Sequence, residues 1–157
     1  MSVPVLSRRP TARRSLLTAH IVVSVGLLGD CAVLLATAVR AATTADPELA
    51  AAAYELMQLF SLAFGIPLSF ASLLTGLALG AGTKWGVLRH GWVIAKLALI
   101  VSVIAVGALV IGPSEAAMTG GDGGREAVLV VAAAYQALAL VLATGLSVFK
   151  PRRRATR

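Results

Sequence analysis

The sequence predicts an all-α integral membrane protein, a four-helix bundle with both its N and C termini in the cytoplasm. Its 157 residues are 58% hydrophobic and 13% charged, whereas a soluble domain has about 45–50% apolar and about 25% charged residues. The mean hydropathy is +0.87 although only 5% of the residues are aromatic, so aliphatic side chains supply the hydrophobicity. Four apolar stretches each provide the roughly 20 residues that a helix needs to cross a bilayer. These observations exclude a soluble globular domain.

The first predicted span covers residues 16–39 and follows a basic tail, residues 1–15. Its length, about 24 residues, is sufficient for one membrane crossing. The single cysteine, Cys31, lies inside this span, away from any cluster of cysteine and histidine residues. We therefore expect neither an intramolecular disulfide nor a metal site.

The second helix is predicted to begin near Pro47, because proline suits the first turn of a helix and Asp46 suits the preceding N-cap. It continues to Ala81, which makes it about 35 residues or about 52 Å long if it is straight. That length exceeds the hydrocarbon thickness, so residues 55–81 are assigned to the membrane. We expect a bend at Pro67, just after Gly65.

The third predicted span covers residues 91–111 and ends at Gly112-Pro113, since proline does not continue a helix. The fourth covers residues 127–149 and is followed by a second basic tail, residues 150–157. Residues 16–149 therefore form one transmembrane domain between two basic tails.

The distribution of charge predicts the orientation in the membrane. The N-terminal tail, the loop between the second and third spans and the C-terminal tail carry arginine and lysine and no acid. The other two connections hold most of the acids. Because positive loops stay in the cytoplasm, both termini and the middle loop are predicted to be cytoplasmic, in a multi-pass protein of the bacterial plasma membrane. The net charge is +7. Because the cations flank the membrane spans, this charge indicates interaction with lipid and not with nucleic acid.

Several stretches resemble a known group of proteins. They are Leu17-Thr18-Ala19-His20, Pro67-Leu68-Ser69, Ser72-Leu73-Leu74-Thr75-Gly76-Leu77, Lys84-Trp85-Gly86-Val87-Leu88-Arg89-His90 and Trp92-Val93-Ile94-Ala95-Lys96-Leu97. In these stretches the chain resembles the small four-span membrane proteins of unassigned function found in actinobacteria. The resemblance covers the first three spans, and Asp30-Cys31 departs from the apolar pair expected there. It implies a helical bundle in the plasma membrane and supplies no activity.

Asp30 is the residue whose placement in the membrane costs most, about 2.5–3.5 kcal/mol for an acid near the centre of a span. At the predicted depths, Lys96 is too far away for a direct bridge. Gln136, beside Tyr135 near the middle of the fourth span, has a depth similar to that of Asp30, so we expect an Asp30–Gln136 hydrogen bond. Two interpretations fit: a site that titrates or contacts a ligand, and a structural bond between helices with the acid protonated.

Two histidines lie at the same predicted side of the membrane. His20 is about one turn inside the first span, and His90 stands at the start of the third. Two histidines from two helices at similar depth are able to ligate a haem iron axially, as in cytochrome-b-like electron carriers. The alternative is one hydrogen-bonded interfacial histidine and one loop histidine.

The densest group of cations and tryptophans lies around the middle loop. On a helix, residues three and four positions apart share a face, as Arg89, Trp92 and Lys96 do. Such a face is typical of anchoring at the membrane surface, and it also suits a site for anionic lipid or a partner protein. The group comprises Lys84, Trp85, Arg89, Trp92 and Lys96.

Polar and small residues recur at helical spacing along the second helix. Between helices in lipid, such stripes bring backbones close together. The alternative is a substrate path beside the Pro67 bend, with Glu55 near its outer mouth. The stripe comprises Glu55, Gln58, Gly65, Ser69, Ser72 and Gly76.

No catalytic residue and no set of metal ligands is recognisable, so the sequence does not favour an enzyme. It predicts a non-enzymatic membrane component, an accessory subunit or a small-ligand or lipid-binding component, with no cofactor. One alternative is a haem b electron carrier that uses His20 and His90, and another is a proton-coupled small-molecule transporter that uses Asp30. The expected partners are anionic lipids at the cytoplasmic face and a second copy or another membrane protein, and no nucleic acid.

Overall fold

The computed structural model describes residues 10–81, 91–112 and 124–149. The elements in chain order are α1 (Pro10–Thr43), α2 (Pro47–Phe60), the π-helical turn η2 (Ser61–Gly65), α3 (Ile66–Ala81), α4 (Gly91–Val106), the π-helical turn η3 (Gly107–Ile111) and α6 (Gly124–Phe149). Within these residues, four helices are long and apolar enough to cross a membrane, and two of them are interrupted by a π-turn. The all-α fold is thereby confirmed, whereas the orientation of the termini stays a prediction.

The helices extend beyond several predicted boundaries. Helix α1 begins at Pro10, so the last residues of the predicted tail 1–15 are helical. The reason is local, because proline is favoured in the first turn of a helix and Thr11 through Ser15 contain no helix breaker. At its other end α1 continues to Thr43, past the predicted end at Val39.

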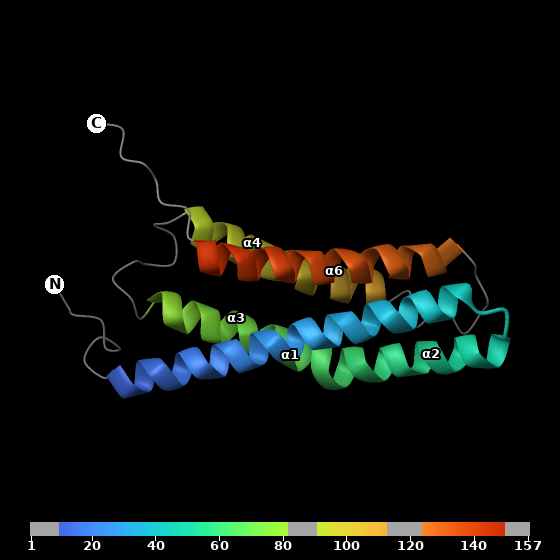
Figure 1. The fold of residues 1–157 in the computed structure, drawn as a ribbon, viewed down its shortest axis with the longest axis horizontal. Helices are drawn as coiled ribbons and strands as arrows, with labels where there is room; N and C mark the ends of the chain where they lie inside the picture. The colour runs from blue at the N-terminus through green and yellow to red at the C-terminus, as the bar shows by residue number, and fades with distance from the viewer. Residues whose placement is uncertain (1–9, 82–90, 113–123, 150–157) are drawn as a thin grey trace.

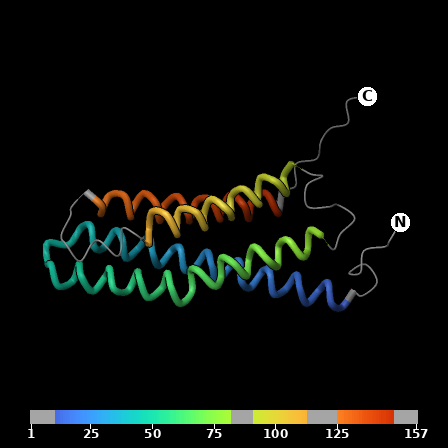
Figure 2. The backbone as a smooth tube through the Cα atoms, turned by 180° about the vertical axis from the view of Figure 1, so that it is seen from behind, coloured from blue at the N-terminus to red at the C-terminus, as the bar shows by residue number. Residues whose placement is uncertain are grey.

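The second helix has the predicted cap and the predicted bend. Asp46 Oδ1 accepts hydrogen bonds from the backbone N–H groups of Glu48 at 3.0 Å and Leu49 at 3.4 Å. In η2 the Ile66 N–H bonds to the carbonyl of Ser61, five residues earlier. Figure 2 shows the chain changing direction between α2 and α3. Both η2 and the missing N–H of Pro67 interrupt the regular α-helical ladder there.

Helix α1 has a central position in the bundle. It packs against α2 and α3 on one side and against α6 on another, and α4 packs mainly on α6 (Figure 1). Two apolar clusters fill the interior. The first cluster consists of Leu34, Ala38, Met57, Ile111, Leu129 and Ala132. The second consists of Leu27, Cys31, Val103, Ala139 and Leu140.

The outer surface of the bundle is also apolar. Large aliphatic side chains are exposed on every membrane-spanning helix, for example Val22 on α1, Leu74 on α3, Leu109 in η3 and Leu138 on α6. A water-soluble protein rarely exposes so continuous an apolar surface. The exposed side chains are the surface that lipid covers.

Candidate intramembrane polar site

Two buried polar side chains lie between the two apolar clusters. Asp30 and Gln136 are each only 5% exposed. On α1, Asp30 stands between Leu27 of one cluster and Leu34 of the other. Gln136 stands midway between Arg125 and Ser147, the ends of the fourth membrane-spanning segment. Both side chains therefore lie near the middle of their membrane-spanning segments.

The predicted Asp30–Gln136 hydrogen bond is wrong. Gln136 Nε2 donates instead to the backbone carbonyl of Val103 on α4, at 3.0 Å. Its Oε1 and both carboxyl oxygens of Asp30 find no hydrogen-bond partner among the described residues. The reason is that α6 presents this glutamine to α4, and equal depth does not imply equal direction around a helix axis.

The carboxyl group of Asp30 lies against the backbone of η2. A Cβ atom on Gly65 would be 3.0 Å from Asp30 Oδ2, which is closer than side-chain carbons normally approach an oxygen. Gln136 has a similar neighbour, because a Cβ atom on Gly107, the first residue of η3, would be 3.3 Å from Gln136 Nε2. Each buried polar side chain thus faces a glycine in a π-helical turn, a feature common at functional sites.

Substitution of Gln136 by leucine tests whether its single bond stabilises the bundle. We expect the free energy of unfolding to change by less than about 1 kcal/mol, because the lost bond is offset by removal of the unpartnered Oε1. Denaturation by sodium dodecyl sulfate in mixed micelles measures this value. Gln58→Leu, on the exposed face of α2, serves as the matched control. A loss for Gln136→Leu well above that of the control would contradict this expectation.

The π-turn also rearranges the predicted polar stripe of the second helix. Each residue of an α-helix advances about 100° around the axis. A π-turn contains one extra residue, so the residues after it are rotated by about the same angle relative to their positions in an uninterrupted α-helix. Ala53 and Met57 before the turn therefore share the buried face with Ser69 and Ser72 after it. The prediction of one stripe was wrong in its first part, because Glu55 and Gln58 are exposed.

A second polar group lies along α1 and α3, toward the N-terminal end of α1. His20 Nδ1 and Thr75 Oγ1 are 2.8 Å apart. The Thr75 hydroxyl donates its one hydrogen to the carbonyl of Ala71 at 2.6 Å, so it accepts a hydrogen from His20 Nδ1. Nε2 is then the unprotonated nitrogen of the neutral ring. One turn nearer the membrane centre, Ser24 Oγ and Ser72 Oγ are 3.3 Å apart.

Lys96 and Tyr135 also bond to side chains on other helices. Lys96 Nζ donates to Ser147 Oγ on α6 at 2.6 Å, and no bridge to Asp30 forms, as expected. The Tyr135 hydroxyl donates to Ser102 Oγ on α4 at 2.7 Å, on the exposed side of the bundle. Tyr135 is therefore separate from the buried layer that contains its neighbour Gln136.

Several predicted site residues lie outside the described part of the chain. They are Lys84, Trp85, Arg89 and His90. The predicted haem pair is therefore placed only at His20. Trp92, half-buried on α4, is described. In residues 10–81, 91–112 and 124–149, no group of three or more histidine, cysteine, aspartate or glutamate side chains is arranged to hold a metal ion.

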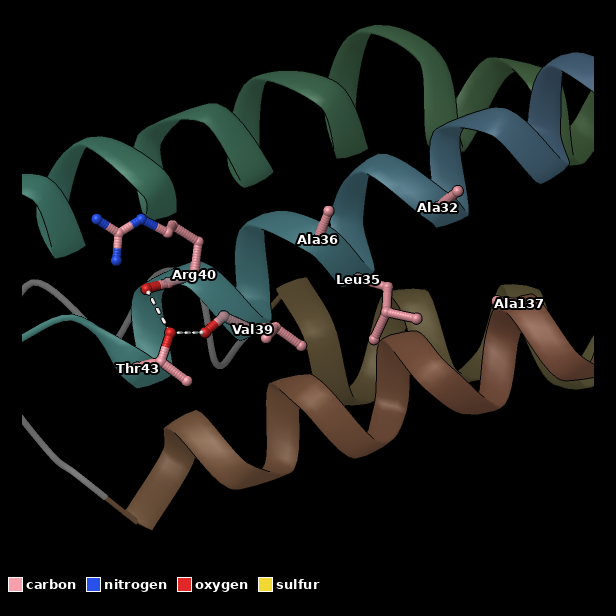
Figure 3. Close-up of a pocket in the computed structure, with 7 residues that line it drawn as sticks. All are labelled: Ala32, Leu35, Ala36, Val39, Arg40, Thr43 and Ala137. Carbon is pink, nitrogen blue, oxygen red and sulfur yellow. Dashed lines mark hydrogen bonds between the residues drawn. The ribbon is translucent and has the colours of Figure 1, made fainter.

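The groove between α1 and α6 is not a polar site. Its lining is almost entirely aliphatic and lies on the outside of the bundle, with Leu35 pointing toward α6 (Figure 3). Thr43 uses its hydroxyl on its own helix, donating to the carbonyls of Val39 at 2.8 Å and Arg40 at 3.4 Å. The polar chemistry lies in the interior, at Asp30 and around His20.

Comparison with known families agrees with this architecture. A family model described as a predicted integral membrane protein, DUF2269, matches residues 14–151. The chain belongs to this family. The match includes the fourth span, which the sequence resemblance did not reach, and does not bear on the predicted actinobacterial origin. No curated protein and no solved structure matches the chain.

Membership of DUF2269 confirms a multi-pass integral membrane protein and assigns no activity. Sequence reasoning found Asp30, Gln136 and His20 but missed the groups they contact. Val103 contributes a backbone carbonyl, and no residue pattern reports such a role. For Thr75 the sequence does offer a signal, since a hydroxyl and a histidine at similar depth on neighbouring helices can form a hydrogen bond.

Proposed function

We propose that this DUF2269 protein is a proton-coupled membrane transporter in which Asp30 binds and releases the coupling proton. One observation carries the proposal: a carboxyl group in the middle of the membrane is only 5% exposed and finds no hydrogen-bond partner among the described residues. Acids in membrane helices are rare and mark proton relays and ion pathways. The solute would be a small molecule that enters the bundle beside α1 and α3.

The environment of Asp30 supports a change between two protonation states. An ionised carboxylate without a partner is strongly disfavoured inside the bundle, whereas the neutral acid is tolerated. Release of the proton therefore requires a change that lets water or a cation reach the group. The neighbouring helix is suited to such a change, because η2 and Pro67 already interrupt its hydrogen-bond ladder.

The polar groups of α1 and α3 support access from one side. His20 with Thr75 and Ser24 with Ser72 form successive polar contacts between these helices. Asp30 beside Gly65 continues the same interface toward the membrane centre. In the predicted orientation this side is cytoplasmic, so protons would reach Asp30 from the cytoplasm.

Infrared difference spectroscopy tests whether Asp30 titrates. The full chain is reconstituted in lipid vesicles and spectra are compared across pH. We expect a carbonyl band of a protonated carboxyl group in the wild-type protein that disappears as the pH rises and is missing from Asp30→Asn. Glu55→Gln, which removes an exposed acid from the second helix, is the matched control and should retain the band.

Two results would contradict the proposal. One is a band that is unchanged over the whole pH range in which the protein stays folded, which would make Asp30 a structural acid. The other is a carboxylate band that responds to sodium ions at constant pH, which would make the coupling ion a metal cation. Asparagine is close in shape to aspartate, so we expect Asp30→Asn to fold. Thermal unfolding of Asp30→Asn and of the Glu55→Gln control checks this.

A second candidate function is haem-based electron transfer through His20 and His90. The contact that favours it is the hydrogen bond to Thr75, because ligating histidines commonly donate one ring N–H and leave the other nitrogen for the metal. An absorption spectrum of the protein purified from haem-replete cells, oxidised and then reduced with dithionite, decides this. A stoichiometric Soret band that is lost in His20→Ala would favour haem over the proton site.

A further inference from the structure

We propose that His20, Lys96 and the hydroxyl groups around them form a binding site for a phosphate-type anion. The site lies at the end of the bundle where α1 and α4 begin and α3 and α6 end. Each of these four helices contributes to it. The contributing side chains are His20 and Ser24 from α1, Ser72 and Thr75 from α3, Lys96 from α4 and Ser147 from α6.

Lys96 is directed into the bundle. A lysine near the end of a membrane helix normally extends its ammonium group toward water and lipid headgroups. Here the Nζ atom donates to Ser147 Oγ on a neighbouring helix at 2.6 Å, and Ser147 in turn donates to the carbonyl of Ala143 at 3.0 Å. An ammonium group has three N–H donors, and in the described part of the chain Ser147 takes one of them.

His20 lies at the same end of the bundle as this ammonium group, on α1, which packs against both α3 and α6. The hydrogen bond to Thr75 engages Nδ1, which makes Nε2 the acceptor nitrogen of the neutral ring. A hydroxyl group can donate to Nε2, and an ionised oxygen can accept from Lys96. Inorganic phosphate near neutral pH offers a P–OH group and ionised oxygens, and phosphatidylglycerol offers glycerol hydroxyls and an ionised phosphodiester.

The charge at this end of the bundle is not balanced by the described residues. The described acids other than Asp30 lie at the opposite end or on α2, namely Asp46, Glu48, Glu55 and Glu126. Asp30 is about 15 Å from His20 along α1. Two helices begin and two end at this side, so their macrodipoles largely cancel. A positive group in a membrane without a counter-ion is costly, and a bound anion would supply the missing charge.

An anion of this chemistry has two sources, the headgroup of an anionic phospholipid and free phosphate. Basic sites between membrane helices on the cytoplasmic side bind such headgroups. The site shares His20, Ser24, Ser72 and Thr75 with the proposed proton access route. Anion binding does not require Asp30, so it is tested separately from the proton chemistry.

Binding is tested with the full chain in a nonionic detergent. The probes are phosphatidylglycerol, zwitterionic phosphatidylcholine and sodium phosphate, and the readouts are the thermal unfolding midpoint and lipid retained in native mass spectrometry. We expect phosphatidylglycerol to raise the midpoint more than phosphatidylcholine does. Lys96→Met should weaken its binding about tenfold or more, because hydrogen bonds to charged groups are strong, and Lys96→Arg should retain most of it.

Arg40→Met is the matched control, because it removes an exposed cation from the opposite end of α1. It should bind phosphatidylglycerol as the wild type does. If Lys96→Met does not fold, His20→Leu tests the same site. Stabilisation by sodium phosphate equal to that by phosphatidylglycerol would identify the free ion as the source. Equal binding by wild type and Lys96→Met, or no response to either anion, would overturn the proposal.

Discussion

Gly65→Leu is expected to lower the free energy of unfolding by about 1–3 kcal/mol, the usual cost of forcing extra methylene groups into a packed interior. Already the first added carbon would stand 3.0 Å from Asp30 Oδ2. A leucine adds three more carbons in a space bounded by α1 and by the π-turn itself. Either the carboxyl group or the whole of η2 must then move.

The change is measured by denaturation in mixed micelles, and Gly29→Leu is the matched control. A Cβ atom on Gly29 would have nothing within 4 Å, so its side chain would extend toward lipid and the stability should stay within about 0.5 kcal/mol of wild type. In the infrared experiment, Gly65→Leu should also alter the Asp30 band, since it displaces that carboxyl group. Equal stability of the two leucine variants would show that Gly65 is not in close contact with Asp30.

Met57→Ala is expected to produce a loss of stability at the lower end of about 2–5 kcal/mol, the range for methionine or leucine truncations in cores. Met57 has 0% exposure and packs in the apolar cluster that joins α1, α2, η3 and α6. Lipid is as apolar as methionine, so the transfer part of the cost is small. The cavity and the lost van der Waals contacts remain.

Leu59→Ala is the control for this substitution. It lies two residues away on the same helix and is 60% exposed, so its truncation removes contacts with lipid and leaves the packed cluster intact. We expect a change of less than about 0.5 kcal/mol in the same denaturation experiment. A loss for Leu59→Ala as large as that for Met57→Ala would mean that the buried face of α2 has been assigned wrongly.

Together these variants separate the two roles assigned to the second helix. Met57 tests the packing of α2 before the π-turn, and Gly65 tests the contact that the turn makes with Asp30. If both predictions hold, the π-turn places an apolar face and a polar contact on the same side of one helix. The proposed proton site requires this arrangement, because the carboxyl group of Asp30 must be buried by neighbouring helices without a hydrogen-bond partner.

Much of the architecture follows from single residues and short patterns. Apolar length, the Asp46 cap before Pro47 and the bend beside Pro67 were all predictable, because each depends on transfer free energy or on local backbone chemistry. Asp30 and Gln136 were recognisable as intramembrane polar residues for the same reason. Their similar depth followed from counting residues along each helix.

The direction in which a side chain points around its helix axis could not be predicted from the sequence in the same way. The hydrogen bond of Gln136 goes to Val103 on α4, and that of His20 goes to Thr75 on α3. Each depends on how two helices rotate against each other. The π-turn η2 shifts the later part of its helix by one residue, which moves Glu55 and Gln58 away from the face that holds Ser69 and Ser72.

Hydropathy and charge depend on residue type alone, so membrane insertion and the number of helices can be predicted from the sequence. The hydrogen-bond partner of a side chain depends on how the helices pack. A strict 3.6-residue period put Glu55 and Ser69 on one stripe, and one extra residue in a helical turn separated them. The unbonded state of Asp30 has the same origin, because it depends on a glycine backbone from one helix and the orientation of a glutamine on another.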